Sequence, residues 1–136
     1  MNTEAMLASF LDDWKSDPNR AKVAFMQYKE LLSVPNVSFH WKARPGVSYS
    51  LRAQHSAQKN RDLFVLIDVI DDEPENRWLS VCFYADMVTD PKELADFVPN
   101  GLLGEDARCF NLEDDDENMK AYIADRLQEA LAYAKS

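Results

Sequence analysis

The chain has 136 residues, with 15 Lys and Arg against 24 Asp and Glu, and a formal net charge of −9. Its apolar fraction of 46% is sufficient for one hydrophobic core, so we expect a single domain over residues 1–136. Only three glycines are present, and neither GxGxxG nor GxxxxGK[ST] occurs, which disfavours the common phosphate-binding loops and a nucleotide cofactor.

Charge is distributed unevenly along the chain. Residues 1–68 carry 9 basic and 7 acidic side chains, whereas residues 69–136 carry 6 basic and 17 acidic ones. The basic excess is concentrated between His40 and Arg61. We therefore expect one positive end on an otherwise negative molecule, a distribution that disfavours nucleic acid and membrane surfaces as partners.

The N-terminal residues 1–10 show neither the basic start nor the long apolar run of a signal peptide. The longest apolar run, Leu63–Ile67, is far too short to cross a membrane. These features favour a cytoplasmic protein. Because Cys82 and Cys109 lie in strand-like segments, we expect both to be reduced, buried thiols.

Two helices are predicted near the N-terminus. Over residues 3–14, apolar side chains recur at helical spacing, and Asn2 or Thr3 is a suitable N-cap. The second helix is predicted to begin with Asp17 as N-cap and Pro18 at the first helical position, and to end before Pro35.

Residues 37–53 predict a β-hairpin that bends at Arg44–Gly46. A three-residue loop would pair Trp41 with Tyr49 and place the apolar residues of both strands on one face. Gly46 suits the positive φ that such a loop requires. Trp41 and Tyr49 are therefore expected in the core.

The next segments predict further strands. Residues 63–70 are almost wholly apolar, which is typical of a central strand covered on both faces. Residues 78–84 form a second strand, a capping box opens a short helix over 90–97, and residues 107–112 form an edge strand after a loop over 99–106.

A long C-terminal helix is predicted to begin after an Asp within residues 114–116. The order of elements indicates an α+β fold with two N-terminal helices, an antiparallel meander-like sheet of four to five strands, and the C-terminal helix packed on the sheet.

Asp68 is the first candidate for a ligand site, because a carboxylate within an apolar strand is costly unless it is paired or hydrated. It either faces a polar cleft or lies where the strand emerges at the end of the sheet. In the first case, Asp68 would line a ligand pocket with neighbouring side chains. The candidate partners are Arg52, Arg77, Trp78 and Tyr84.

The basic hairpin, residues 40–61, is the nucleic-acid alternative. Its basic side chains are Lys42, Arg44, Arg52, Lys59 and Arg61. Stacking on Trp41 and Tyr49 would complete a single-strand site, but their placement in the core and the net charge both argue against it.

Catalysis and metal binding have weaker support. His40 shares a strand face with Ser48 and Ser50, yet no acid lies near them in the sequence to orient the imidazole, and only tertiary folding could bring Asp62 or Asp68 close. Neither CxxC nor HExxH occurs, and the acidic run 113–117 lacks the pattern of a calcium loop. We expect no metal and no cofactor.

The apolar residues around the loop 97–103 are either a partner-binding patch or anchors tucked under the sheet, and we favour the second.

Taken together, the sequence favours a non-catalytic binding or protein-interaction module, with a protein partner, a second copy or a small molecule as its ligand. The alternatives are a nucleic-acid-associated protein using the hairpin and a small enzyme with a pocket around Asp68. If helices cover only one side of the sheet, the face carrying Trp78, Ser80, Cys82 and Tyr84 is expected to be a pocket wall or a dimer surface.

Overall fold

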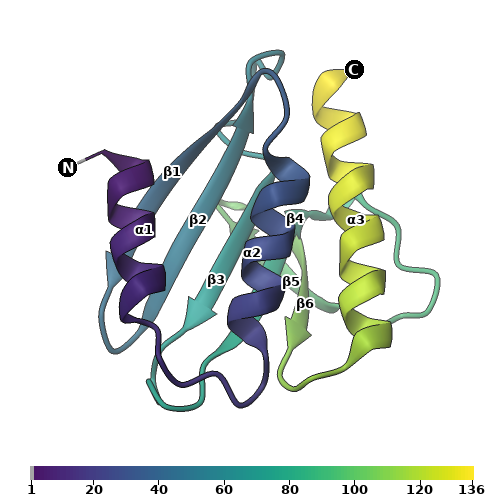
Figure 1. The fold of residues 1–136 in the computed structure, drawn as a ribbon. Helices are drawn as coiled ribbons and strands as arrows, with labels where there is room; N and C mark the ends of the chain where they lie inside the picture. The colour runs from purple at the N-terminus through teal and green to yellow at the C-terminus, as the bar shows by residue number, and fades with distance from the viewer. Residues whose placement is uncertain (1) are drawn as a thin grey trace.

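The computed structural model describes residues 2–136 as three α-helices and one six-stranded antiparallel sheet (Figure 1). The helices are α1 (Thr3–Asp13), α2 (Ala21–Leu32) and α3 (Glu117–Lys135). The strands are β1 (Val37–Arg44), β2 (Ser48–His55), β3 (Val65–Ile70), β4 (Trp78–Tyr84), β5 (Asp96–Leu102) and β6 (Glu105–Leu112), in the order β1-β2-β3-β4-β6-β5. The predicted α+β class is confirmed, with six strands rather than four to five.

All three α-helices lie on the same side of the sheet, as Figure 1 shows. Burial along the central strand β3 alternates accordingly: Val65, Ile67 and Val69 are fully buried, whereas Leu66 and Ile70 are half-buried. The helices therefore cover only one face of this strand, and the other face is partly buried. We call the opposite side, where the half-buried residues lie, the helix-free face.

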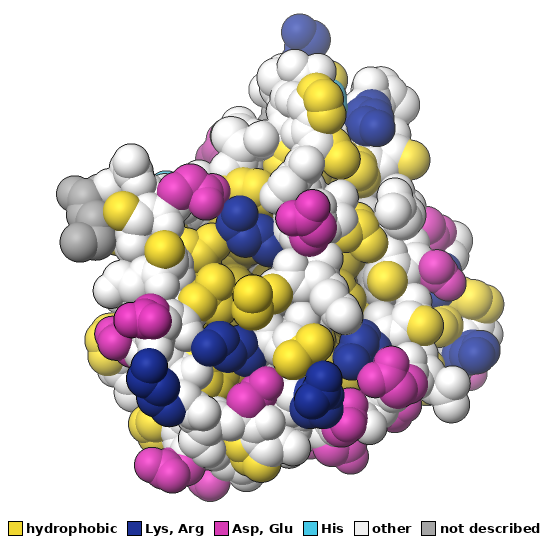
Figure 2. All heavy atoms as spheres, in the orientation of Figure 1, with side chains coloured by type: hydrophobic (Ala, Val, Ile, Leu, Met, Phe, Trp, Pro, Cys, Tyr) yellow, Lys and Arg dark blue, Asp and Glu magenta, His cyan; other side chains and the backbone are white. Residues whose placement is uncertain are grey.

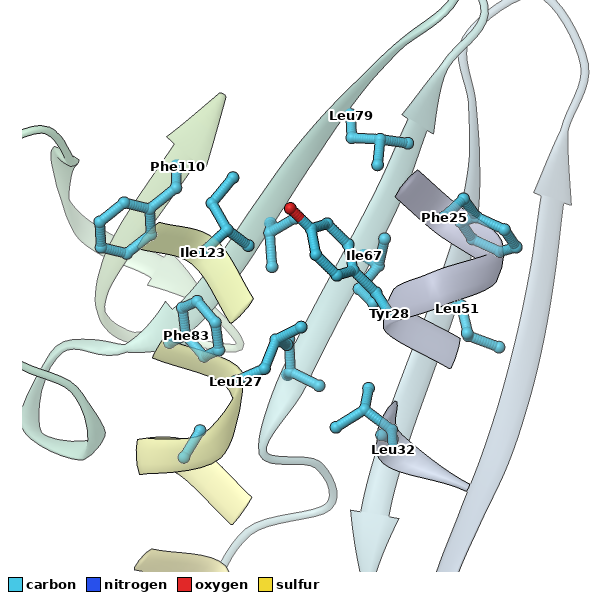
Figure 3. Packing of buried hydrophobic residues seen from close by; sticks show 14 of the residues in the cluster. Phe25, Tyr28, Leu32, Leu51, Ile67, Leu79, Phe83, Phe110, Ile123 and Leu127 are labelled. Carbon is cyan, nitrogen blue, oxygen red and sulfur yellow. The ribbon is translucent and has the colours of Figure 1, made fainter. Parts of the chain in front are cut away.

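The core lies between the sheet and the helices. Figure 3 shows side chains of α2 and α3 directed onto the sheet. The two helices are joined by a buried hydrogen bond, since Tyr28 Oη donates to the carbonyl of Lys120 at 2.9 Å. The largest contributors are Phe25, Tyr28 and Leu32 from α2, Ile123 and Leu127 from α3, and Leu51, Ile67, Leu79, Phe83 and Phe110 from the strands.

The helix ends agree only partly with the sequence. Asn2 caps α1 by accepting from Ala5 N at 2.8 Å, and Asp116 caps α3 by accepting from Met119 N, both as expected. The second helix, however, begins at Ala21 and not at Pro18. Arg20 has a left-handed backbone with φ of 55°, so the helix cannot extend back to Asp17, which instead accepts from Lys22 N.

The β1–β2 hairpin has the expected three-residue loop, but its register differs by two residues. Trp41 lies opposite Leu51, and Tyr49 lies opposite Ala43. The reason is that Val47 N donates to Arg44 O at 2.9 Å and Gly46 takes a φ of 83°, which moves the loop one residue toward the C-terminus. A shift of two preserves the faces, so Trp41 is 6% exposed and is a core residue, as predicted.

The region after β4 differs most from expectation. No helix forms over residues 90–97. Asp90 accepts hydrogen bonds from Leu94 N and Ala95 N within an irregular segment, and β5 follows at Asp96. The expected loop over residues 99–106 is instead a hairpin that makes β6 an interior strand. A bulge interrupts β5, where Gly101 lies so close to Val98 that a Cβ would come within 2.4 Å of its side chain.

Three apolar residues of this hairpin were expected to anchor it beneath the sheet, but they are exposed. The exposed fractions are 56% for Phe97, 37% for Val98 and 57% for Leu103, and only Leu102 is buried. β5 is an edge strand, so it has a neighbouring strand on one side only.

Cys82 and Cys109 form a disulfide between β4 and β6, where they lie directly opposite each other. Both are half-buried on the helix-free face. The prediction of reduced, buried thiols is therefore wrong, because the strand register brings together two residues that are 27 apart in sequence. It also removes one reason to expect a cytoplasmic protein, since stable disulfides are typical of oxidising compartments.

The helix side of the molecule carries both signs of charge. Figure 2 shows Lys and Arg interspersed with Asp and Glu around apolar side chains on this side. Among the described residues, no helix has the length and apolar character required to cross a membrane.

Candidate binding site on the helix-free face

The helix-free face is unusually polar for the middle of a sheet. One row of directly paired residues crosses five strands through Ser50, Asp68 and Ser80, with Lys42 at one end and Asn111 at the other. Ser50 is buried, and Asp68, Ser80 and Asn111 are half-buried. This row therefore makes the middle of the helix-free face polar.

Asp68 lies in this row and not at the end of the sheet. The hydroxyl of Ser50 donates to its Oδ1. Burial raises the pKa of the Asp68 carboxyl, and this effect outweighs the opposing influence of the Ser50 hydrogen bond and of Arg44 and Arg52. The two basic side chains therefore lie close enough to Asp68 to affect its ionisation.

A hollow of about 420 Å³ opens beside this row. It is lined by Ser38, Phe39, His40, Arg52, Gln54, Asp62, Leu63 and Leu103. Leu103 belongs to the turn after β5, whereas Ser38 to His40 belong to β1, and these strands are the two edges of the sheet. The sheet is therefore strongly coiled around its helix-free face, and Figure 1 shows the tip of the β5–β6 hairpin passing behind the neighbouring strands.

Arg52 is the most informative side chain in the hollow. Its Nε is buried and has no hydrogen-bond acceptor among the described residues. Arg126 also has buried nitrogens without a hydrogen-bond acceptor, but it forms an ion pair with Glu129, and Arg61 and Arg77 are likewise paired with carboxylates. A buried donor without an acceptor is costly, so Arg52 has an unmet requirement for an anionic or carbonyl partner.

Asp62 brings the opposite charge to the same hollow. Its carboxylate is exposed and forms neither a hydrogen bond nor an ion pair within residues 2–136. Tyr84 lies near both charges. Burial is the main cause of its raised pKa, Glu105 and Asp62 raise it further, and Arg61 and Arg52 lower it. Within residues 2–136, the hollow thus brings together one cation and one anion that form no ion pair.

The candidate ligand residues named from the sequence are divided between the two sides of the sheet. Asp68, Arg52, Trp78 and Tyr84 share the helix-free face by strand alternation. Arg77 does not join them, because its guanidinium lies over the ring of Phe10 on the helix side. It forms an ion pair with Asp71 instead.

From the sequence, Leu103 was expected to be an anchor of the apolar loop 97–103 or part of a partner-binding patch, and Asp62 was recognised only as an acid that folding could bring close. Neither carries a local signal, since one lies in a turn and the other in a polar connection. Both reach the hollow through contacts between segments that are far apart in the sequence.

The basic residues of the nucleic-acid alternative are also dispersed. Lys42, Arg44 and Lys59 are exposed, but Arg61 is held by two carboxylates. Trp41 is buried under α1, with its ring centroid 5.1 Å from that of Phe10. The aromatic ring that stacking would require is therefore not presented beside these cations.

A second hollow, of about 580 Å³, lies around Arg61. It is lined by residues 57–61, Asp86, Met87, Glu105, Tyr133, Ala134 and Ser136. Although it is larger, its central cation is already neutralised by Asp86 and Glu105, and the Arg61 guanidinium is stacked 4.1 Å from the ring centroid of Tyr84. We therefore regard the Arg52 hollow as the better candidate for ligand binding.

The chemistry available for catalysis is limited. Ser50 donates to Asp68, and no hydrogen bond links His40 to a serine in the described part of the chain. Nor do residues 2–136 contain a cluster of three His, Cys, Asp or Glu side chains suitable for a metal ion. No protein-family model, curated protein or solved structure matches the chain.

Proposed function

We propose that this protein is a non-catalytic binding module that holds a small carboxylate-bearing ligand in the Arg52 hollow. The observation that carries the proposal is the buried Nε of Arg52, which has no acceptor among residues 2–136. A guanidinium presents parallel N–H groups that match the two oxygens of a carboxylate. A ligand carboxylate would supply the missing acceptor.

The hollow has a suitable size and a suitable lining. Its volume of about 420 Å³ is within the usual range for small-molecule sites. Leu63 and Leu103 give it apolar lining, while Ser38 and Gln54 offer polar groups. A mixed lining of this kind orients a small organic acid and also buries its carbon skeleton.

Binding is favoured over catalysis because the site lacks an activated nucleophile. A serine nucleophile requires a neighbouring base, and Ser50 is instead hydrogen-bonded to the carboxyl of Asp68. The charge of Arg52 positions a ligand but does not by itself provide a reaction.

Calorimetric titration of the full chain with a panel of small organic acids, including 4-methylpentanoate, tests the proposal. We expect saturable 1:1 binding by the wild type and at least a tenfold loss with Arg52→Gln, which keeps a polar side chain but removes the charge. Lys42→Gln is the matched control, because Lys42 is an exposed cation on the same face but does not line the hollow.

Equal losses from Arg52→Gln and Lys42→Gln would show a general effect of surface charge and would contradict a specific site. The absence of binding by every acid in the panel would overturn the proposal. Thermal unfolding of both variants establishes that each is folded before it is titrated.

A further inference from the structure

We infer, on the basis of the proposed function, that the ligand is a free α-amino acid with an apolar side chain. In this arrangement Arg52 binds the carboxylate, Asp62 binds the ammonium group, and Leu63 and Leu103 contact the side chain. The inference rests on the joint placement of one unpaired cation, one unpaired anion and an apolar wall around a single hollow.

The presence of Asp62 argues against a ligand that carries only negative charge. An isolated carboxylate or phosphate entering the hollow would be attracted by Arg52 but repelled by Asp62, because both side chains line it. A ligand carrying both charges satisfies both side chains. Because Arg52 and Asp62 line the same hollow, a ligand whose two charges lie close together, as they do in a free α-amino acid, can meet both.

Asp62 is held beside Arg52 by the backbone. Phe64 N donates to the carbonyl of Ala53 at 2.8 Å, which fixes the segment preceding β3 against the residue next to Arg52. The side chain of Gln58 braces the same segment by donating to Leu63 O at 2.8 Å. The two charged residues are therefore positioned by rigid hydrogen bonds rather than by a free loop.

Leu103 supports an apolar ligand group independently of the charges. It is a non-glycine residue with a left-handed φ of 50°, and its side chain is 57% exposed. Each of these features costs free energy, and glycine or asparagine would occupy such a turn position more readily. A strained residue that also exposes apolar surface to a hollow is explained if its side chain contacts a bound ligand.

The test compares three compounds that share the isobutyl group of leucine. Leucine carries both charges, 4-methylpentanoate lacks the ammonium group, and 3-methylbutylamine lacks the carboxylate. We expect leucine to bind the wild-type chain at least tenfold more tightly than either analogue in calorimetric titrations at pH 7.

Three variants assign the contacts. Asp62→Asn should weaken the binding of leucine about tenfold, because it removes the attraction for the ammonium group. The same variant should bind 4-methylpentanoate equally or more tightly, because it removes a repulsion for the carboxylate. Arg52→Gln should weaken the binding of both leucine and 4-methylpentanoate. Leu103→Ser should weaken the binding of leucine but leave the binding of alanine unchanged. Asp72→Asn, which alters an exposed carboxylate in the β3–β4 turn outside the hollow, is the control and should change none of these values.

The outcomes distinguish this inference from the proposed function. If 4-methylpentanoate binds as tightly as leucine and Asp62→Asn has no effect, the amino-acid assignment is overturned while carboxylate binding stands. If Asp62→Asn weakens both compounds equally, Asp62 has a structural role and the assignment also fails. If neither leucine nor any organic acid binds, both conclusions fail.

Discussion

Arg77 donates its Nε proton to Oδ1 of Asp71 across 2.7 Å, and the two side chains are only 12% and 4% exposed. The second oxygen of Asp71 accepts from Gly46 N at 2.8 Å, and the Arg77 guanidinium lies 5.1 Å from the ring centroid of Phe10. This single ion pair therefore connects the β1–β2 turn, the β3–β4 turn and helix α1.

Breaking this pair should strongly destabilise the fold. We expect Asp71→Asn to lower the free energy of unfolding by about 3–5 kcal/mol, because it leaves the buried charge of Arg77 without a counter-charge. Urea denaturation measures the change. The exposed pair between Lys29 and Glu4 provides the control, and Glu4→Gln should cost less than about 1 kcal/mol. Similar small losses in both variants would show that the buried pair has no special structural role.

The β1–β2 hairpin offers a second comparison of core and surface. Trp41→Ala should lower the free energy of unfolding by about 3–5 kcal/mol, the usual cost of removing a large buried aromatic side chain. Arg44→Ala should change it by less than about 0.5 kcal/mol, because Arg44 is exposed and bonds only to the Ser48 hydroxyl. Chemical denaturation of the two variants checks both values, and near-equal small effects would contradict the burial of Trp41.

Asp68 makes a prediction about pH. Burial raises the pKa of its carboxyl in the folded state above the value in the unfolded chain, so the folded state binds the proton more tightly. The resulting penalty is absent below the unfolded pKa of about 4, develops as the pH rises toward the folded pKa, and is complete above it.

Asp68→Asn should therefore stabilise the protein at pH 7, and the gain should disappear below about pH 4. The amide oxygen of Asn can still accept from Ser50. Urea midpoints of the two proteins, measured side by side at each pH, isolate the contribution of this residue. A variant that is less stable at pH 7 would mean that the charge of Asp68 is favourably compensated by its neighbours.

The two cysteines allow a direct test of the cross-strand pair. We expect Cys82→Ala/Cys109→Ala to lower the free energy of unfolding by about 2–4 kcal/mol relative to the oxidised wild type, since the bond closes a loop between residues 27 apart. Adding a thiol reductant should bring the wild type close to the variant. Rapid thiol labelling of the native protein without reductant, together with no effect of reductant on stability, would contradict the disulfide.

The acidic composition predicts that the protein does not bind duplex DNA at physiological salt. With a net charge of −9, and with Arg61 already neutralised by two carboxylates, few cations remain to displace counterions from phosphates. An electrophoretic shift assay at low micromolar protein checks this. Binding with a steep salt dependence would restore the hairpin as a nucleic-acid surface.

The local pattern of the chain predicted much of the architecture. Alternation in the hairpin placed Trp41 in the core, and Asp116 was within the range predicted to cap the C-terminal helix. Such features depend on the period of apolar side chains and on the capping preferences of short polar ones, which operate over a few residues. For this reason the α+β class could be derived without knowledge of any long-range contact.

The tertiary structure alone decided the rest. The segment around Pro99 is a strand because it pairs with β6, and Cys82 meets Cys109 because β4 and β6 are neighbours. Arg52 and Asp62 share a hollow because the connection before β3 is bonded back to β2, and Leu103 joins them because the sheet is coiled. Periodicity records which side of an element is buried, but it does not specify which distant segment lies against that side. The partners of a charge or a thiol depend on strand order and sheet curvature, which are set by the packing of the whole chain.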